Sequence, residues 1–319
     1  MTSYTDKIRE ASKRLLKEGT VDMVIGFAKG SVPMMNQPMH AVNQGDVDRF
    51  VWDGNCGINL ANYVTGRTER IGIVAKGCDS RNLAVHIVEN KIKRDQLYII
   101  GVPCTGMIDR HRLTTAVSGE IESVTEDEAG KTVTVSGDGF SETFNRADVL
   151  QENCALCMHR NPVIYDERIA DEVPEQSDED VDRYAAVKQI EAMRPEEKWA
   201  YFDDLLSDCI RCYACRNACP LCYCPTCFVD ESKPQWVGKS TEMPDVRIFH
   251  FLRAYHCAGR CTDCGACVRS CPVGINVRAM TKKLEKDCLE YFGWEAGLTT
   301  DQRPPLDTYK PDDPEQFIK

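Results

Sequence analysis

The chain reads Cys209-Ile-Arg-Cys212-Tyr-Ala-Cys215-Arg-Asn-Ala-Cys219-Pro220 and, further on, Cys261-Thr-Asp-Cys264-Gly-Ala-Cys267-Val-Arg-Ser-Cys271-Pro272. The two stretches have the same cysteine spacing. Two residues between successive cysteines let the backbone curl round one corner of an iron–sulfur cube at a time, and the proline after each fourth cysteine turns the chain away. The repeat therefore predicts two [4Fe-4S] clusters.

This spacing is the bacterial two-cluster ferredoxin pattern, in which the fourth cysteine of each run binds the other cube. The predicted ligands of the first cluster are Cys209, Cys212, Cys215 and Cys271, and those of the second are Cys261, Cys264, Cys267 and Cys219. The crossed ligands would place the cubes side by side, close enough for electron transfer. Two zinc knuckles are the alternative, but zinc needs four ligands per site and no third cysteine at this interval.

The composition restricts the class of protein. A chain of 319 residues is long enough for two domains, or for one large and one small, with a buried core. Its 50 acidic and 39 basic residues give a net charge of −11, which argues against a nucleic-acid surface or a polybasic membrane contact. We expect the partner to be another protein or a small molecule.

The 18 cysteines also indicate the compartment. The chain begins Met1-Thr-Ser-Tyr-Thr-Asp-Lys without an apolar signal core, so a secreted disulfide framework is not expected. The thiols are predicted to be metal ligands in a reducing cytoplasm, and their number suggests an anaerobe. No window has the apolar length that a bilayer span requires, so direct membrane insertion is not expected.

The first half of the chain alternates helical and apolar strand patterns. Helices are predicted at 5–18 and around 83–88, and buried strands at 21–28, 71–75 and 97–102. Strand, turn, helix, strand is typical of a parallel α/β unit, whose ligands gather at the carboxyl ends of its strands. A hairpin is predicted at 121–135, and the segment 29–55 is predicted to be a long functional loop.

Four segments are predicted along the chain. They are an α/β domain that binds flavin and a [4Fe-4S] cluster (1–165), an acidic linker and helix (166–207), a mainly α two-cluster ferredoxin-like domain (208–290) and an extended tail (291–319). In the second half, helices are predicted from Pro195, at 245–257 and at 281–292.

Four further cysteines lie in the first half. Cys78 and Cys104 each follow an apolar run, and Cys154-Ala-Leu-Cys157 is a close pair. His159 stands one position too late for a heme-attachment motif, and no Gly-x-Gly-x-x-Gly follows a strand. A redox disulfide between Cys154 and Cys157, or a set of buried inert thiols, stays open as an alternative to metal binding.

The order Val74-Ala-Lys-Gly-Cys78, Ile100-Gly-Val-Pro-Cys104 and Cys154-Ala-Leu-Cys157 resembles the β subunits of the coenzyme F420 hydrogenase and dehydrogenase family, over about residues 20–165. The resemblance implies a third [4Fe-4S] cluster, held by Cys78, Cys104, Cys154 and Cys157, beside an FAD that exchanges a hydride with the deazaflavin. The chain departs from the family in two respects. The glycine-rich N-terminal segment of its deazaflavin-reducing members is not evident, and the ferredoxin pattern follows the flavin domain.

Candidate flavin contacts come from two places. The turn Gly77-Cys78-Asp79-Ser80-Arg81 combines backbone N–H groups at a helix start with a guanidinium, which suits a pyrophosphate. A plain helix cap at Asp79 or Ser80 is an equal alternative. The loops that could wrap the isoalloxazine ring contain Lys29, Asn55 and Asn59.

The remaining cysteines are less regular. Cys222, Cys224 and Cys227 follow Pro220, and Cys257 precedes the second run. These four thiols are predicted either to hold a further cluster or a zinc ion, or to be packing residues that shield the first cube. The two other cysteines, Cys56 and Cys288, are predicted to be ordinary buried residues.

Together the patterns predict an oxidoreductase subunit in which FAD exchanges a hydride with a soluble carrier, coenzyme F420 or a nicotinamide, and single electrons pass through [4Fe-4S] clusters. The flavin is needed because a hydride carries two electrons and a cube carries one. The expected partners are a ferredoxin or other subunits of a redox complex of the formate dehydrogenase, hydrogenase or heterodisulfide-reductase type. The alternative function is a non-catalytic ferredoxin adapter without flavin.

Overall fold

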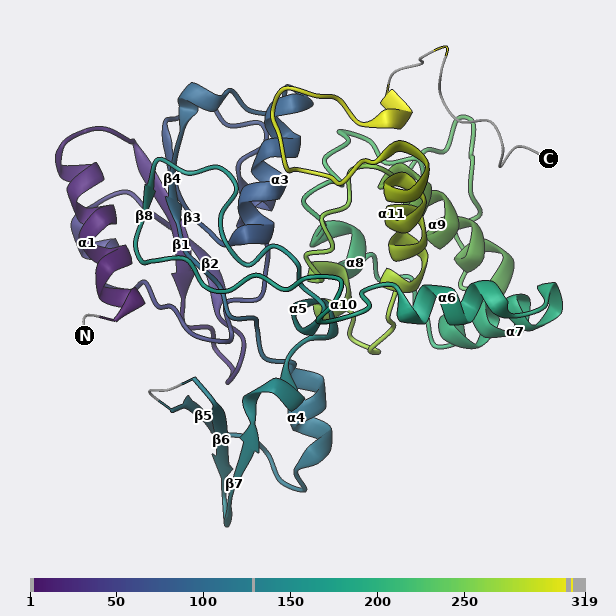
Figure 1. Cartoon of the computed structure of the whole chain (residues 1–319), viewed down its shortest axis with the longest axis horizontal. Helices are drawn as coiled ribbons and strands as arrows, with labels where there is room; N and C mark the ends of the chain where they lie inside the picture. The colour runs from purple at the N-terminus through teal and green to yellow at the C-terminus, as the bar shows by residue number, and fades with distance from the viewer. Residues whose placement is uncertain (1–2, 128–129, 308–310, 312–319) are drawn as a thin grey trace.

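A computed structural model describes residues 3–127, 130–307 and 311. The chain forms two halves that lie side by side (Figure 1). We call residues 3–168 the α/β half and residues 185–307 the helical half. The mixed α/β architecture and the cysteine-rich helical second half agree with the predicted fold class, while the four predicted segment boundaries stay predictions.

The α/β half is built on a five-stranded sheet with the strand order β2-β1-β3-β4-β8. β2 is antiparallel to β1, and the other neighbouring strands are parallel. The strands are β1 (Met23–Ala28), β2 (Gln37–Ala41), β3 (Ile71–Ala75), β4 (Leu97–Gly101) and β8 (Glu167–Arg168). The helical elements are α1 (Tyr4–Lys17), α2 (Gln44–Val47), η1 (Leu60–Tyr63), α3 (Gly77–Val88), η2 (Arg94–Gln96) and α5 (Glu152–Ala155).

The core of this half lies on both faces of the sheet, because α1 and α3 cover opposite faces (Figure 1). Every residue of β1 and β3 is buried, as expected for parallel strands between two helical layers. Ile25, Ile73 and Ile99 form the centre of the core, with Leu15 of α1 and Leu83 of α3 packed against the sheet. The helices and strands predicted for this core are confirmed to within a few residues.

A small antiparallel sheet, β5-β6-β7, projects from the α/β half together with α4 (Figure 1). Its elements are α4 (Arg110–Ala116), β5 (Ser123–Glu126), β6 (Thr132–Gly137), β7 (Phe140–Asn145) and η3 (Arg146–Val149). Leu113, Val133 and Val135 form its separate core. The predicted hairpin is confirmed, and β7 adds a third strand whose mostly polar sequence gave no signal.

Two segments differ from the predictions. The expected loop 29–55 contains β2 and α2. The expected acidic linker begins with β8, an edge strand that is fixed to β4 because Asp166 Oδ2 accepts a hydrogen bond from the Ile99 backbone N–H (2.7 Å). Edge strands are commonly polar, so the acidic composition of this segment disguised its place in the sheet.

The helical half surrounds the two cysteine runs. Its elements are α6 (Ala185–Ala192), α7 (Pro195–Leu206), α8 (Ala214–Asn217), α9 (Met243–His256), α10 (Ala266–Arg269), α11 (Arg278–Phe292) and η4 (Pro305–Asp307). Leu206, Phe249 and Met280 join α7, α9 and α11 in one core. The helices predicted from Pro195, at 245–257 and at 281–292 are confirmed. Residues 308–310 and 312–319 of the predicted extended tail lie outside the described residues.

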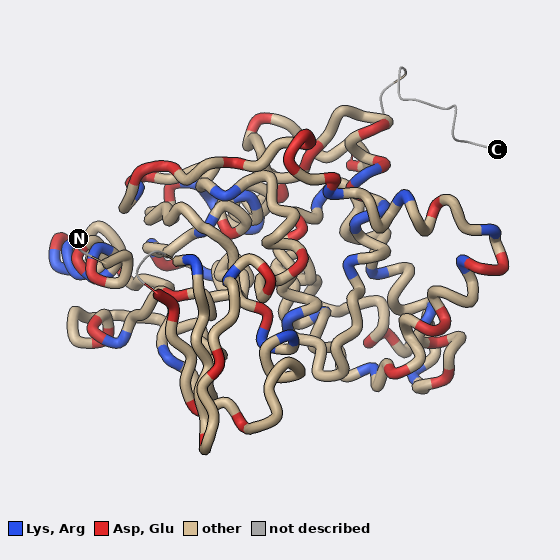
Figure 2. Tube along the Cα trace, turned by 60° about the horizontal axis from the view of Figure 1, so that its bottom comes forward, with Lys and Arg blue, Asp and Glu red and all other residues tan. Residues whose placement is uncertain are grey.

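None of the helices in the described ranges is long and apolar enough to cross a bilayer. Acidic and basic residues are interspersed along the trace in the view of Figure 2.

Replacement of Ile99 by alanine tests the position of the sheet core. Ile99 is fully buried in β4, so Ile99→Ala should lower the free energy of unfolding by about 2–5 kcal/mol through lost burial and a cavity. Ile248→Ala is the matched control, because the Ile248 side chain is 44% exposed on α9. Thermal melting followed by circular dichroism should show a clearly lower Tm for Ile99→Ala only, and equal effects would contradict this packing.

Candidate iron–sulfur centres

Four of the five cysteines of the α/β half, all except Cys56, line one cavity of about 680 Å³, which we call the front cavity. Cys78 lies in the first turn of α3 and Cys104 follows β4, so both come from the carboxyl edge of the parallel sheet. Cys154 lies in α5, and Cys157 follows it. The fold thus brings together thiols that are far apart in sequence, in the grouping that the family resemblance implies.

The four cysteines of the front cavity are half-buried. Burial raises the pKa of Cys154 to about 12 and that of Cys157 to about 11. Backbone and amide N–H groups face two of the sulfurs, since Gly106 N lies 3.4 Å from Cys104 Sγ and Asn153 Nδ2 lies 3.6 Å from Cys154 Sγ. Such donors stabilise thiolate ligands, so the donor set fits an iron–sulfur cube.

A buried lysine lies beside these thiols. Lys76 is 2% exposed, and its ammonium is 2.8 Å from Asp79 Oδ2 and 3.1 Å from the Ile58 carbonyl oxygen. Burial alone would lower the Lys76 pKa, but the Asp79 carboxylate and the thiols of Cys78 and Cys104 raise it above its usual value. Lys76 therefore stays protonated in the wall of the front cavity as one member of a buried ion pair.

Two smaller cavities lie in the helical half. The middle cavity, of about 380 Å³, is lined by Cys219, Cys261, Cys264 and Cys267. The outer cavity, of about 340 Å³, is lined by Cys209, Cys212, Cys215 and Cys271. Each cavity thus contains one predicted ligand set, including the fourth cysteine that comes from the other run. That these thiols bind cubes stays a prediction.

The two cysteine runs share an unusual backbone. The residues on either side of the second cysteine have left-handed φ angles in both: 49° at Arg211 and 61° at Tyr213, and 54° at Asp263 and 71° at Gly265. Three of these four residues have a side chain that disfavours this conformation. Backbone strain of this kind persists only where the surrounding structure holds the residues in place, and such residues are common in ligand-binding loops. The equal spacing therefore corresponds to an equal loop conformation.

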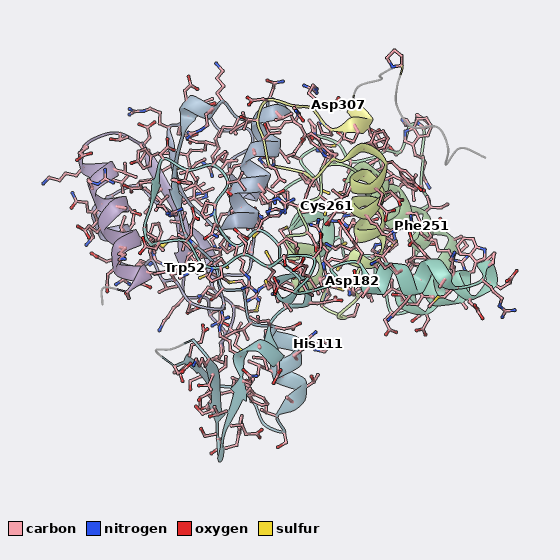
Figure 3. All side chains as sticks on the ribbon, in the orientation of Figure 1. Trp52, His111, Asp182, Phe251, Cys261 and Asp307 are labelled. Carbon is pink, nitrogen blue, oxygen red and sulfur yellow. The ribbon has the colours of Figure 1, made fainter. Side chains whose placement is uncertain are left out.

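The segment from Thr262 to Cys264 lines both the front and the middle cavity. Asp263 within it is held by α11, because Arg278 Nε lies 2.6 Å from its Oδ1 and Lys282 Nζ 2.9 Å from its Oδ2. Figure 3 places Cys261, at the start of the second run, where the two halves meet. The front and middle cavities are therefore neighbours with one short peptide between them.

The structure separates the four cysteines for which a further metal site was predicted. The Cys219 thiol is hydrogen-bonded to the side chains of Cys222 and Cys257. Cys227 is instead hydrogen-bonded to Arg216, and Cys224 is exposed. In the described part of the chain, no three His, Cys, Asp or Glu side chains are arranged to hold a single metal ion. The further site stays a prediction.

The polar groups at the start of α3 are bonded within the fold, and the pyrophosphate site that the sequence suggested there stays a prediction. A side chain at Gly77 would lie 2.2 Å from the His159 carbonyl oxygen, so the segment after Cys157 covers this helix end. Asp79 accepts hydrogen bonds from the Lys76 and Leu60 backbone N–H groups, which is the helix-cap alternative. The other polar side chains of the turn also have hydrogen-bond partners. The Ser80 hydroxyl donates to the Gly77 carbonyl oxygen and accepts from the Val163 backbone N–H. The Arg81 guanidinium donates to the Glu295 carboxylate and to the Ala296 carbonyl oxygen.

The other three flavin candidates lie in different environments. Lys29 is exposed, and Asn59 caps η1 and donates to the Cys78 carbonyl oxygen (3.2 Å). Asn55 is 7% exposed, and its Oδ1 has no hydrogen-bond partner within the described residues. A buried acceptor without a donor fits a site for a bound group. Gly57, two residues after Asn55, is part of the wall of the front cavity.

Sequence reasoning missed several cations near the cysteines, among them the buried Lys76, Arg211 and Arg253 and the half-buried Arg269. Arg269 donates to the carbonyl oxygens of Met34 (2.9 Å), Ile108 (3.0 Å) and Asn55 (3.1 Å), so one guanidinium joins three loops of the α/β half. Its position inside the Cys267-Val-Arg-Ser-Cys271 run was the available signal. Because Arg269 stands between the predicted ligands Cys267 and Cys271, its side chain can be expected to lie near the predicted clusters.

No protein-family model matches the chain. A curated relative, the F420-dependent formate dehydrogenase subunit beta of Methanocaldococcus jannaschii, is 22% identical over 355 aligned positions, which cover 92% of this chain and 92% of that protein. The F420-dependent formate dehydrogenase 1 subunit beta of Methanococcus maripaludis is 23% identical over 356 positions, with 92% and 90% covered. The chain is a homologue of these β subunits.

The predicted relationship to the coenzyme F420 hydrogenase and dehydrogenase β subunits is therefore confirmed, and so is its class, because the homologues are components of oxidoreductases. A solved chain of the F420-reducing [NiFe] hydrogenase complex from Methanosarcina barkeri is also similar. It is 14% identical with a TM-score of 0.38, over 48% of this chain and 58% of that one. The fusion to a ferredoxin domain stays a prediction.

Glu295 provides a test of the charged contacts between the two halves. Burial would raise its pKa, but a hydrogen bond from His159 and the charges of Arg81 and Arg183 hold that pKa well below its usual value. The carboxylate therefore stabilises the fold above pH about 4.3, its unfolded pKa, and this contribution is lost as the pH falls further.

Glu295→Gln should accordingly lower the free energy of unfolding by roughly 3 kcal/mol at pH 7, because it removes the carboxylate paired with the buried Arg81 and the carboxylate nearest to the buried Arg183. The difference from the wild type should shrink between pH 5 and pH 3, as measured by urea unfolding. Glu179→Gln, at an exposed position, is the control. A difference that does not change with pH would contradict the assigned ion pairs.

Proposed function

We propose that the chain is the flavin and iron–sulfur subunit of an oxidoreductase complex. FAD exchanges a hydride with a soluble carrier, and single electrons pass through three [4Fe-4S] clusters. The homologues are β subunits of F420-dependent formate dehydrogenases, which supports coenzyme F420 as the carrier and other subunits of a redox complex as partners. Nicotinamide is the second carrier to test, because the chain lacks the glycine-rich N-terminal segment noted above.

The observation that carries the proposal is the arrangement of the twelve predicted ligands around three cavities, two of which share a wall. Four buried thiols around one cavity are the donor set that a [4Fe-4S] cube takes. The peptide from Thr262 to Cys264 belongs to both the front and the middle cavity. Clusters in these cavities would be separated by one short peptide, which favours electron transfer between them.

The third cavity extends this path to the surface. Arg253 lines the middle cavity and donates to the carbonyl oxygen of Cys215, whose side chain lines the outer cavity. Cys212 of the outer set is exposed, and its neighbour Ile210 is 56% exposed. The proposed order is therefore flavin, front cluster, middle cluster, outer cluster and partner protein. Electrons can pass along it in either direction.

The proposed flavin lies next to the front cavity, at the loops after β1 and before η1. Asn55 supports this place, because its unpaired buried Oδ1 can accept a hydrogen bond from a flavin ring N–H. When bound, the flavin converts a two-electron hydride transfer into single-electron steps. The chain's own contribution is to fix these loops, which Arg269 does through its bonds to the Met34 and Asn55 carbonyl oxygens.

The deciding measurement is the content of iron, acid-labile sulfide and flavin per chain, on protein purified without air. Three cubes with about four irons each and one FAD are expected. About eight irons without flavin would instead support the non-catalytic ferredoxin adapter. Reduction of the bound flavin by reduced F420, compared with a reduced nicotinamide, then identifies the carrier.

Cys264→Ser tests the assignment of the middle cluster. Cys264 lines both the front and the middle cavity but belongs by spacing to the middle set. The variant should lose about four irons and keep its flavin. Cys288→Ser is the control, because Cys288 is buried but lines none of the three cavities, and its iron content should be unchanged. Loss of flavin with full iron would contradict the assignment.

Asn55→Ala tests the flavin site. Removal of the unpaired acceptor should lower the flavin content, or weaken flavin binding by roughly tenfold, which corresponds to one hydrogen bond of about 1.4 kcal/mol. The iron content should stay unchanged. Asn62→Ala is the control, since the Asn62 amide donates to the Asn217 carbonyl oxygen outside this region. Equal flavin affinity in both variants would place the flavin elsewhere.

A further inference from the structure

Arg253 lies between the middle and the outer cavity. It comes from the last turn of α9, is 4% exposed and is part of the wall of the middle cavity. Its Nη2 donates to the Cys215 carbonyl oxygen at 3.1 Å, and Cys215 is a predicted ligand of the outer cluster. One guanidinium therefore faces both predicted ligand sets.

Arg253 has no carboxylate partner among the described residues. Its one hydrogen bond goes to a backbone carbonyl oxygen, and its Nε has no acceptor. The neighbouring groups that can become negative are the thiols of Cys219, Cys267, Cys257 and Cys215. Two other buried arginines of the helical half line these cavities and have carboxylate partners: Arg278 is paired with Asp263 and Glu152, and Arg211 lies 3.9 Å from Asp245.

A buried guanidinium without a counter-charge is strongly unfavourable, so a native fold rarely keeps one. The missing negative charge is supplied if the surrounding thiols are deprotonated and bind iron, because a cube with four thiolate ligands is an anion. Reduction adds one more negative charge to that cube. A nearby cation stabilises the reduced form more than the oxidised form and so raises the reduction potential.

We propose that Arg253 is the shared counter-charge of the middle and outer clusters and sets the reduction potentials of both. The inference rests on the proposed function, because it requires that the two cubes are present. Arg253 touches neither a flavin nor a substrate, so it acts through the clusters. Because one charge faces both cubes, it raises the two potentials together.

The test is a redox titration of the complete chain, purified without air and followed by electron paramagnetic resonance. Arg253→Gln removes the charge but keeps a hydrogen-bond donor for the Cys215 carbonyl oxygen, and Arg253→Lys keeps the charge. With iron content equal to that of the wild type, Arg253→Gln should shift the potentials of both clusters to more negative values. Arg253→Lys should leave them near the wild-type values.

Arg247→Gln is the matched control on the same helix, because Arg247 pairs with Asp203 near the surface and lines neither cavity. It should change neither potential. Unchanged potentials in Arg253→Gln, or an equal shift in Arg253→Lys and Arg253→Gln, would overturn the role of the charge. A wild-type chain without cluster signals would overturn the proposed function itself, so the two failures are distinguishable.

Discussion

The arrangement of the candidate centres depends on the buried carboxylate of Asp263. Asp263 has a left-handed φ of 54° and stands directly before Cys264. Arg278 and Lys282 of α11 hold its carboxylate and so fix the only peptide that separates the front and middle cavities in the described structure. Without this clamp the strained loop could relax, and Cys264 would lose its place between the two cavities. The helical half thus places its ligands by means of α11.

Burial of many thiols also imposes a charge constraint. An iron–sulfur cube with four thiolates is an anion, and an unpaired anion in a low-dielectric interior is costly. Each cavity has a buried cation in its wall: Lys76 at the front, Arg253 in the middle and Arg211 at the outer cavity. Lys76 is already balanced by Asp79, whereas Arg253 has no such partner. The front and middle cations therefore differ in whether a carboxylate already balances them.

Much of the fold could be predicted because its signals are local. β3 and β4 are apolar runs between helices, and in each cysteine run the spacing of the cysteines predicts the loop conformation. The front ligand set was predicted from family resemblance, because Cys78 and Cys104 are brought to one edge only by the parallel order of β3 and β4, and Cys154 joins them from α5. Two features could not be predicted from neighbouring residues in the sequence. One is the packing of the segment near His159 against the first residues of α3, and the other is the direction in which the Arg253 side chain points from α9.

The contacts between the halves argue against two independent modules. Arg269 lies inside the second cysteine run, yet it bonds to backbone carbonyl oxygens in three loops of the α/β half. If the helical half were removed, those carbonyl groups would lose their donor, and Arg81 would lose its bond to the Ala296 carbonyl oxygen. Buried polar groups without partners are costly. Hence the loop that carries Asn55 is held in its final form by a side chain of the second cysteine run, whether or not a cluster is bound there.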